Sequence, residues 1–127
     1  MKKIYVYGTL RPGCVANVVK GRGTMVNLGG FPGVVLDDNG PEFTAEVVEV
    51  DDETLADLDR YEGYRPSDPV NSLYVRKPFM DGEIYEFNRS GENAEVVTSG
   101  DWLIFTGEPR GWAAGMVGNQ AALEEAM

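Results

Sequence analysis

Short apolar stretches alternate with turn residues along this chain, and the pattern predicts many short β-strands. Apolar, aromatic and β-branched residues cluster in runs that are bounded by glycine, proline, aspartate or asparagine. The predicted strands cover residues 2–10, 23–28, 34–36, 43–50, 73–80, 83–87, 94–98 and 102–105. Because residues 2–10 are apolar or aromatic at most positions, we expect this strand to be buried on both faces. The dipeptide Asp81-Gly82 predicts a hairpin with a two-residue turn.

One segment has helical periodicity, and we predict a helix over residues 52–61. Leu55 and Leu58 are three residues apart and therefore share one helical face. Asp51 or Asp52 can cap the N-terminus, and Gly63 can end the helix in a left-handed conformation. A second short helix is predicted over residues 119–126. Many short strands around one clear helix favour an α+β fold with a curved or closed sheet.

Length, charge and cysteine content narrow the class of protein. The 127 residues predict a single domain, residues 1–127. The net charge of −10 disfavours binding to nucleic acid or to an anionic membrane. The apolar run near the start stops at Arg11, too short for an export signal or a membrane span. A single cysteine, Cys14, rules out an intramolecular disulfide, so a cytoplasmic location is the default expectation.

The chain has no histidine, which limits the available chemistry. Ser-His-Asp and Cys-His catalysis in their usual forms need an imidazole to take the proton of the nucleophile. One cysteine and no histidine also argue against a zinc site. We expect Cys14 to pack within a loop and Trp102 and Trp112 to be packing residues. Acid–base chemistry would then depend on Asp, Glu, Lys, Tyr or Cys side chains.

Glu62 is the acidic residue that the helical pattern directs toward the core. It lies seven residues after Leu55 and four after Leu58, almost at the centre of the apolar stripe. Burial raises the pKa of a carboxyl group, and a pKa near neutrality suits a general base and acid. Taken alone, the helical pattern favours another interpretation, in which Glu62 lies at a frayed helix end and reaches water.

The first predicted strand runs into the sequence Tyr7-Gly8-Thr9-Leu10, where the β pattern stops abruptly. A glycine such as Gly8 can adopt backbone angles closed to other residues and lets a ligand approach the main chain. This arrangement predicts a loop whose backbone N–H groups surround a small ligand.

Five motifs, in this order and spacing, resemble those of the γ-glutamylcyclotransferase-like family, which includes γ-glutamylamine cyclotransferases and AIG2-like proteins. Together they extend from residue 4 to about residue 103. They are Tyr-Gly-Thr-Leu-Arg-x-Gly at residues 7–13, Gly-Gly-Phe-Pro-Gly at 29–33, Leu-Asp-x-Tyr-Glu-Gly-Tyr at 58–64, Ser-Leu-Tyr-Val-Arg at 72–76 and Ser-Gly-Asp-Trp at 99–102.

The resemblance implies a small mixed β-barrel with flanking helices and a cavity for a γ-glutamyl group. The implied reaction is intramolecular: the α-amine of the substrate attacks its own γ-carbonyl, forms 5-oxoproline and expels an amine. The partner is then a small-molecule γ-glutamyl substrate, and the reaction needs no metal, organic cofactor or enzyme nucleophile. An alternative within the same fold is a non-catalytic module that binds a small ligand or another protein.

The resemblance also assigns roles to particular residues. Glu62 would be the catalytic general base and acid, and Tyr7, Gly8, Thr9 and Leu10 would bind the substrate. Tyr74 and Arg76 match a Tyr-x-Arg pattern beside the cavity, where a structural role such as an Arg–carboxylate pair is at least as compatible with the pattern as substrate contact.

Two features depart from the family pattern. The asparagine of the first loop, Asn17, is spaced one residue further than in the family's usual Gly-x-x-Asn. Residues 106–127 are distinctive to this chain and could cover the mouth of the cavity. Both departures concern the range of substrates more than the fold.

Overall fold

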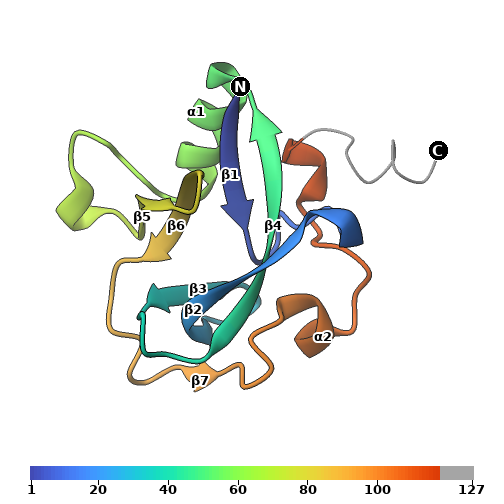
Figure 1. Ribbon diagram of the computed structural model, residues 1–127. Coiled ribbons are helices and arrows are strands. Elements are labelled where there is room, and N and C mark those ends of the chain that lie inside the picture. The colour runs from blue at the N-terminus through green and yellow to red at the C-terminus, as the bar shows by residue number, and fades with distance from the viewer. Residues whose placement is uncertain (118–127) are drawn as a thin grey trace.

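The computed structural model describes residues 1–117 of the chain (Figure 1). These residues form a mixed sheet with two α-helices and three short 3-10 helices. The strands are β1 (Lys2–Val6), β2 (Val18–Asn27), β3 (Pro32–Leu36), β4 (Glu42–Val50), β5 (Tyr74–Phe79), β6 (Gly82–Phe87) and β7 (Glu95–Val96). The helices are α1 (Asp52–Tyr61), α2 (Trp102–Thr106), η1 (Val15–Asn17), η2 (Pro69–Asn71) and η3 (Ala114–Val117).

The sheet has the strand order β3-β2-β4-β1-β6-β5, and β7 pairs with β2. Strand β1 pairs antiparallel with β4 and parallel with β6. The sheet curls until β3 approaches β6, where the Leu36 N–H donates to the Glu86 carboxylate at 2.8 Å. The predicted α+β class with a curved sheet is therefore confirmed, and the sheet is a curled half-barrel.

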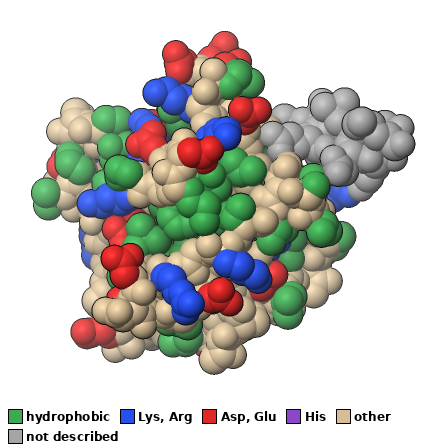
Figure 2. Space-filling model, in the orientation of Figure 1, with side chains coloured by type: hydrophobic (Ala, Val, Ile, Leu, Met, Phe, Trp, Pro, Cys, Tyr) green, Lys and Arg blue, Asp and Glu red, His purple; other side chains and the backbone are tan. Residues whose placement is uncertain are grey.

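Strand β1 is buried on both faces, as its composition predicts. Ile4 and Val6 belong to one hydrophobic cluster, which also contains Leu55 and Leu58 of α1. The alternate residue Tyr5 belongs to a second cluster around Phe43 and Trp102. The buried members of this cluster are Tyr5, Tyr7, Met25, Val34, Phe43, Ala45, Ile84, Val97 and Trp102. Figure 2 shows hydrophobic side chains gathered over the middle of the visible face, where β1 and β4 run, with charged side chains around them.

Helix α1 has the predicted bounds. The Asp51 carboxylate accepts a hydrogen bond from the Thr54 N–H at 2.8 Å, which satisfies one of the free donors of the first turn. At the other end Gly63 has a φ of 66°, the left-handed conformation that ends many helices. Leu55 and Leu58 are buried against the sheet, so the apolar stripe packs as predicted.

The prediction of a strand over residues 102–105 is wrong, because this segment is helix α2. The Asp101 carboxylate accepts hydrogen bonds from the N–H groups of Leu103 and Ile104 at 3.0 and 3.1 Å. Gly107 ends the helix with a φ of 75°. The run of aromatic and β-branched residues favours a strand, but the capping residues on either side favour a helical turn, and the turn buries Trp102.

Other predicted strands have different bounds. The first strand ends at Val6 instead of residue 10, because the Arg11 N–H bonds to the Gly8 carbonyl and closes a turn. The predicted strand 23–28 is the second half of β2, and the predicted strand 94–98 reduces to β7. The predicted helix over residues 119–126 lies outside the described residues.

The β5–β6 hairpin is present, but its turn lies one residue earlier than predicted. Phe79 pairs with Gly82, so Met80 and Asp81 occupy the turn, and Met80 has a φ of 51°. The Asp81 carboxylate accepts a hydrogen bond from the Lys3 ammonium at 2.7 Å and another from the Tyr5 hydroxyl. These contacts with β1 hold the turn in this register.

Three smaller predictions can be compared with residues 1–117. Cys14 is buried and Trp102 packs in the core beside Phe105, as predicted. Within this range, no helix combines the length and the apolar character needed to cross a membrane.

Candidate functional site

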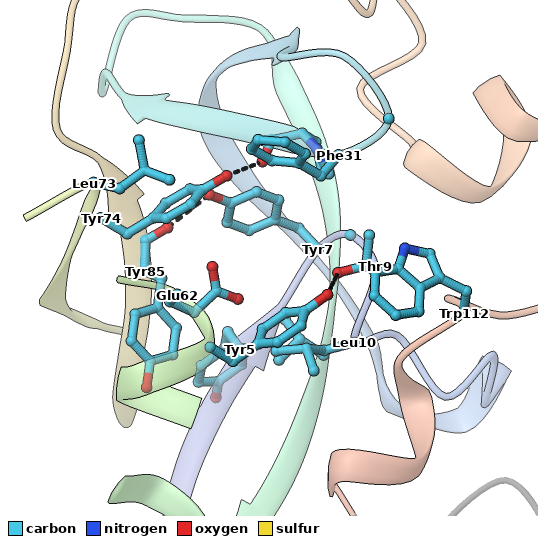
Figure 3. A pocket seen from close by; sticks show the side chains of 15 residues that line it. Tyr5, Tyr7, Thr9, Leu10, Phe31, Glu62, Leu73, Tyr74, Tyr85 and Trp112 are labelled. Atoms are coloured by element: carbon cyan, nitrogen blue, oxygen red, sulfur yellow. Dashed lines mark hydrogen bonds between the residues drawn. The ribbon is translucent and has the colours of Figure 1, made fainter. Parts of the chain in front are cut away.

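A cavity of about 250 Å³ opens where the end of β1, the C-terminus of α1 and the loop before β3 meet (Figure 3). Its walls come from segments that are far apart in the sequence. The lining residues are Tyr5, Val6, Tyr7, Gly8, Thr9, Leu10, Gly30, Phe31, Pro32, Tyr61, Glu62, Leu73, Tyr74, Tyr85 and Trp112.

Glu62 points into this cavity from the C-terminal end of α1 (Figure 3). The helix does not fray there, because the Glu62 N–H bonds to the Leu58 carbonyl at 2.8 Å. Burial raises the pKa of the Glu62 carboxyl to about 8. Near neutral pH the group therefore populates both its protonated and its deprotonated form, as an acid–base catalyst requires. Glu62 is the only lining residue within 1–117 that carries a formal charge when ionised near neutral pH.

Five tyrosines form much of the cavity wall, and the hydroxyl groups of all five have protein partners. Tyr7 donates to the Tyr85 carbonyl at 2.6 Å, and Tyr74 donates to the Pro32 carbonyl at 2.5 Å (Figure 3). Tyr85 donates to the Asp59 carboxylate at 2.6 Å. Burial raises the pKa of the hydroxyls of Tyr7, Tyr74 and Tyr85 above the usual range. These side chains therefore stay neutral and hold the cavity in shape.

The sequence predicts only part of this tyrosine wall. Tyr7 and Tyr74 were expected at the cavity, whereas Tyr5, Tyr61 and Tyr85 were not. Tyr61 directly precedes Glu62, and its hydroxyl lies 2.7 Å from the Thr9 hydroxyl. Tyr85 lies on β6, the parallel neighbour of β1. Only the pairing of these strands shows that it reaches the same cavity.

The loop at residues 7–10 lines the cavity along its whole length. The hydrogen bonds within residues 1–117 give no acceptor to the backbone N–H groups of Gly8, Thr9 and Leu10. These donors are therefore available to a ligand. The reason for glycine at position 8 differs from the prediction, since Gly8 does not have a left-handed backbone. A Cβ there would lie 2.4 Å from Cγ of Pro32, so the site needs glycine for close packing.

Arg76 does not line the cavity, which corrects its expected place, whereas Tyr74 does line it. The Arg76 guanidinium donates to both carboxylate oxygens of Asp59 at 2.9 and 3.2 Å and to Glu83 at 2.7 Å. This is the Arg–carboxylate pairing that the sequence left open. Because Asp59 also accepts the hydrogen bond of Tyr85, Arg76 supports the cavity wall from behind.

A buried group of charges holds the chain that leaves the cavity loop. The Glu46 carboxylate on β4 accepts hydrogen bonds from Arg11 Nε at 2.7 Å and from the backbone N–H groups of Gly13 and Cys14 at 2.9–3.0 Å. Arg11 also donates to Asp101, the capping residue of α2, at 2.8 Å. Sequence reasoning missed this group, although an acidic residue within an apolar strand was a signal for it.

The family model described as gamma-glutamyl cyclotransferase, AIG2-like, matches residues 4–104. The chain belongs to this family. Membership supports a cyclotransferase-type function in general terms, and the resemblance predicted from the motifs is confirmed. No curated protein matches the chain.

Three solved structures share the fold of this chain. An uncharacterized protein, PH0828 from Pyrococcus horikoshii, is 23% identical with a TM-score of 0.59, over 84% of this chain and 93% of that one. The solution structure of ytfP from Escherichia coli is 27% identical with a TM-score of 0.53, over 82% and 98% of the two chains. YkqA from Bacillus subtilis is 20% identical with a TM-score of 0.56, over 84% of this chain and 43% of its own length.

Residues 109–113 follow the segment that matches the AIG2-like family and lie against the cavity loop. The Gly111 N–H donates to the Arg11 carbonyl and the Ala113 N–H to the Thr9 carbonyl, both at 2.8 Å. A Cβ at position 111 would lie 2.2 Å from the Thr9 carbonyl oxygen, so only glycine permits this approach. Of residues 106–127, which were expected to be able to cover the cavity mouth, Trp112 lines the cavity.

Trp112 lies between these two hydrogen-bonded residues, and the prediction that it is a packing residue is wrong. Its side chain lines the cavity and is 77% exposed. Its ring meets the Tyr61 ring edge to face, with the centroids 6.1 Å apart. An exposed tryptophan at a cavity mouth is placed to contact a ligand.

The described part of the chain offers no cluster of three or more Asp, Glu or Cys side chains that could hold a metal ion. Cys14 does not line the cavity.

Proposed function

We propose that this protein is a γ-glutamyl cyclotransferase, which converts a γ-glutamyl amine, amide or peptide into 5-oxoproline and a free amine. The observation that carries the proposal is that one cavity is lined by Glu62 and by Gly8, Thr9 and Leu10, whose N–H groups have no acceptor within residues 1–117. A buried acid with a pKa near neutrality, facing backbone donors, is what a proton transfer at a carbonyl group requires.

In the proposed reaction two protons leave the α-nitrogen of the substrate and reach the leaving nitrogen, and Glu62 carries the first of them. The α-ammonium group of the substrate cannot attack until its proton is removed, and the Glu62 carboxylate accepts that proton. The freed amine attacks the γ-carbonyl carbon and closes a five-membered ring. The bond between this carbon and the leaving nitrogen then breaks, and Glu62 returns the first proton to that nitrogen. The ring nitrogen gives up the second proton, which passes to the departing amine, and the amine leaves as an ammonium ion. No water is consumed, and the enzyme ends in its starting state.

The loop at residues 7–10 supports this step through its main chain. Its N–H groups can hold the α-carboxylate of the substrate or the oxyanion that develops on the γ-carbonyl. Removal of one such donor costs about 3–4 kcal/mol of transition-state stabilisation in other enzymes. The cavity also keeps the glutamyl chain folded, and ring closure depends strongly on that orientation.

The proposal is tested with a panel of γ-glutamyl amines, γ-glutamyl amino acids, γ-glutamyl-ε-lysine and glutathione. Release of 5-oxoproline is measured for the wild type and for Glu62→Gln, which keeps the shape of the side chain and removes its proton transfer. We expect at least one substrate to be turned over, and we expect the variant to lose about 10²–10⁴-fold in rate. Thermal unfolding of both proteins serves as the folding control.

If every substrate fails to give Glu62-dependent 5-oxoproline, the non-catalytic small-ligand module on this fold replaces the proposal.

A further inference from the structure

The mouth of the cavity is apolar and open, although its floor is polar. Three side chains that line it are large, hydrophobic and solvent-exposed: Phe31 by 38%, Leu73 by 41% and Trp112 by 77%. In Figure 3 Leu73 and Phe31 lie above the Glu62 carboxylate, and Trp112 lies to its right. Exposed hydrophobic side chains that converge on a site commonly mark a surface that a ligand covers.

Trp112 is exposed but not loosely attached. The backbone hydrogen bonds of Gly111 and Ala113 fix the chain on both sides of it, and Tyr61 supports one edge of its ring. The rest of the ring is open to solvent. Such a ring offers a preorganised apolar surface, because little conformational freedom is lost when a ligand packs on it.

Phe31 lies across the mouth on a backbone that has room to adjust. It follows Gly29 and Gly30, whose φ angles are 100° and 105° and which have no heavy atom within 4 Å of an added Cβ. Two such glycines give the loop access to many backbone conformations.

The charges around the mouth disfavour an anionic leaving group. No lysine or arginine within residues 1–117 lines the cavity. Nearby guanidinium groups are already paired, Arg76 with Asp59 and Glu83, Arg60 with Asp57, and Arg11 with Glu46 and Asp101. A leaving group that carries carboxylates would lose hydration there without gaining a cationic partner.

We infer that the leaving amine of the substrate lacks a carboxylate and carries an aromatic or bulky aliphatic group, which packs on Trp112 between Phe31 and Leu73. This inference rests on the proposed function and adds a substrate class to it. Glu62 and the loop at residues 7–10 hold the glutamyl half of the substrate, and the apolar mouth holds the other half.

The test compares three substrates with the same glutamyl half: γ-glutamyl-benzylamide, γ-glutamyl-methylamide and γ-glutamyl-glycine. The value of kcat/KM is measured for the wild type, Trp112→Ala and Ile104→Ala. Ile104 is the matched control, because it is a 71% exposed hydrophobic residue outside this cavity. Burial of a group larger than one methylene in an apolar pocket is worth at least about tenfold in kcat/KM.

We expect the wild type to prefer the benzylamide over the methylamide by at least about tenfold, and to turn over γ-glutamyl-glycine most slowly. Trp112→Ala should reduce the benzylamide-to-methylamide ratio several-fold, and Ile104→Ala should leave it unchanged. An equal loss for both amides in Trp112→Ala, or equal turnover of the three substrates by the wild type, overturns the inference and leaves the proposed function standing. Absence of 5-oxoproline from all three overturns the proposed function and the inference with it.

Discussion

The hydroxyl groups of Tyr61 and Thr9 lie 2.7 Å apart and join two segments that are 52 residues apart in the sequence. Tyr61 is the last residue of α1, and Glu62 follows it directly. Thr9 belongs to the loop at residues 7–10, which lines the cavity. This single hydrogen bond therefore sets the position of the carboxylate relative to the backbone donors.

Tyr61→Phe should weaken both the fold and the proposed activity. Loss of the hydrogen bond should lower the free energy of unfolding by about 0.5–1.5 kcal/mol. A shift of Glu62 relative to the loop should also lower kcat/KM, since a displacement of about 1 Å can cost up to about 10²-fold. Urea denaturation and 5-oxoproline release measure the two effects. Tyr64→Phe is the control, because the Tyr64 hydroxyl has no hydrogen-bond partner within residues 1–117. Equal effects of the two variants would contradict the role given to the hydrogen bond between Tyr61 and Thr9.

The rate of the proposed reaction should depend on pH through Glu62. Only the deprotonated carboxylate can accept the proton of the α-ammonium group, and the pKa of Glu62 is about 8. We expect kcat/KM to rise with pH along a limb with an apparent pKa near 8. The residual activity of Glu62→Gln should lack this limb. An ascending limb near pH 4–5 would show that the catalytic carboxyl is an ordinary exposed one.

Stability should depend on pH in the opposite direction. Burial raises the pKa of Glu62 above 4.5 in the folded state, so the folded protein keeps a proton that the unfolded chain has lost. As the pH rises from about 4.5 to about 8, the free energy of unfolding of the wild type should fall relative to that of Glu62→Gln, by at most about 1.4 kcal/mol per pH unit. Urea denaturation at pH 5, 7 and 9 measures the difference. A difference that does not change with pH would mean that the carboxyl is not buried.

Gly8→Ala should disturb the cavity loop through one contact. The added Cβ would lie 2.4 and 2.6 Å from Cγ and Cδ of Pro32, a rigid ring that cannot move aside. We expect lower stability, by about 1–3 kcal/mol, and lower activity. Pro32→Ala removes those two atoms, so the double variant Gly8→Ala/Pro32→Ala should recover part of the loss. Strictly additive losses in this double-mutant cycle would contradict the contact as the cause.

Glu46→Ala should destabilise the fold strongly. Glu46 is fully buried and accepts hydrogen bonds from Arg11, Gly13 and Cys14. Removal of one partner from a buried ion pair costs about 3–5 kcal/mol. Glu49→Ala is the control, because Glu49 is exposed on the same strand, and its loss should lie within about 0.5 kcal/mol. Similar urea midpoints for the two variants would show that the buried group contributes little.

Local signals decided which elements could be predicted. Helix α1 has an aspartate cap, two leucines at helical spacing and a left-handed glycine, and all of these lie within its own segment. Helix α2 has the same signals in Asp101 and Gly107, but Trp102 to Phe105 read as a strand by composition. The strand prediction is wrong there because the capping residues, and not the composition of residues 102–105, decide the conformation.

The site could be predicted where it depends on one segment and not where it depends on packing. Glu62 follows the two buried leucines of its own helix, so its direction could be predicted from spacing. Tyr85 and Trp112 reach the cavity through strand pairing and through hydrogen bonds to residues 9 and 11. Glu46 and Arg11 are 35 residues apart, and neither indicates its partner by sequence alone.

The position of Trp112 outside the segment that matches the family has an evolutionary consequence. Glu62 and the loop at residues 7–10 lie within the shared segment. In this chain Trp112, at the mouth of the cavity, comes from the region after residue 104, where the shared segment ends. In our proposal the two halves of a substrate contact residues that are encoded by different parts of the gene, and these parts can diverge independently. A lineage could acquire a new leaving amine by changing the distal part of its coding sequence, while the reaction itself is inherited unchanged.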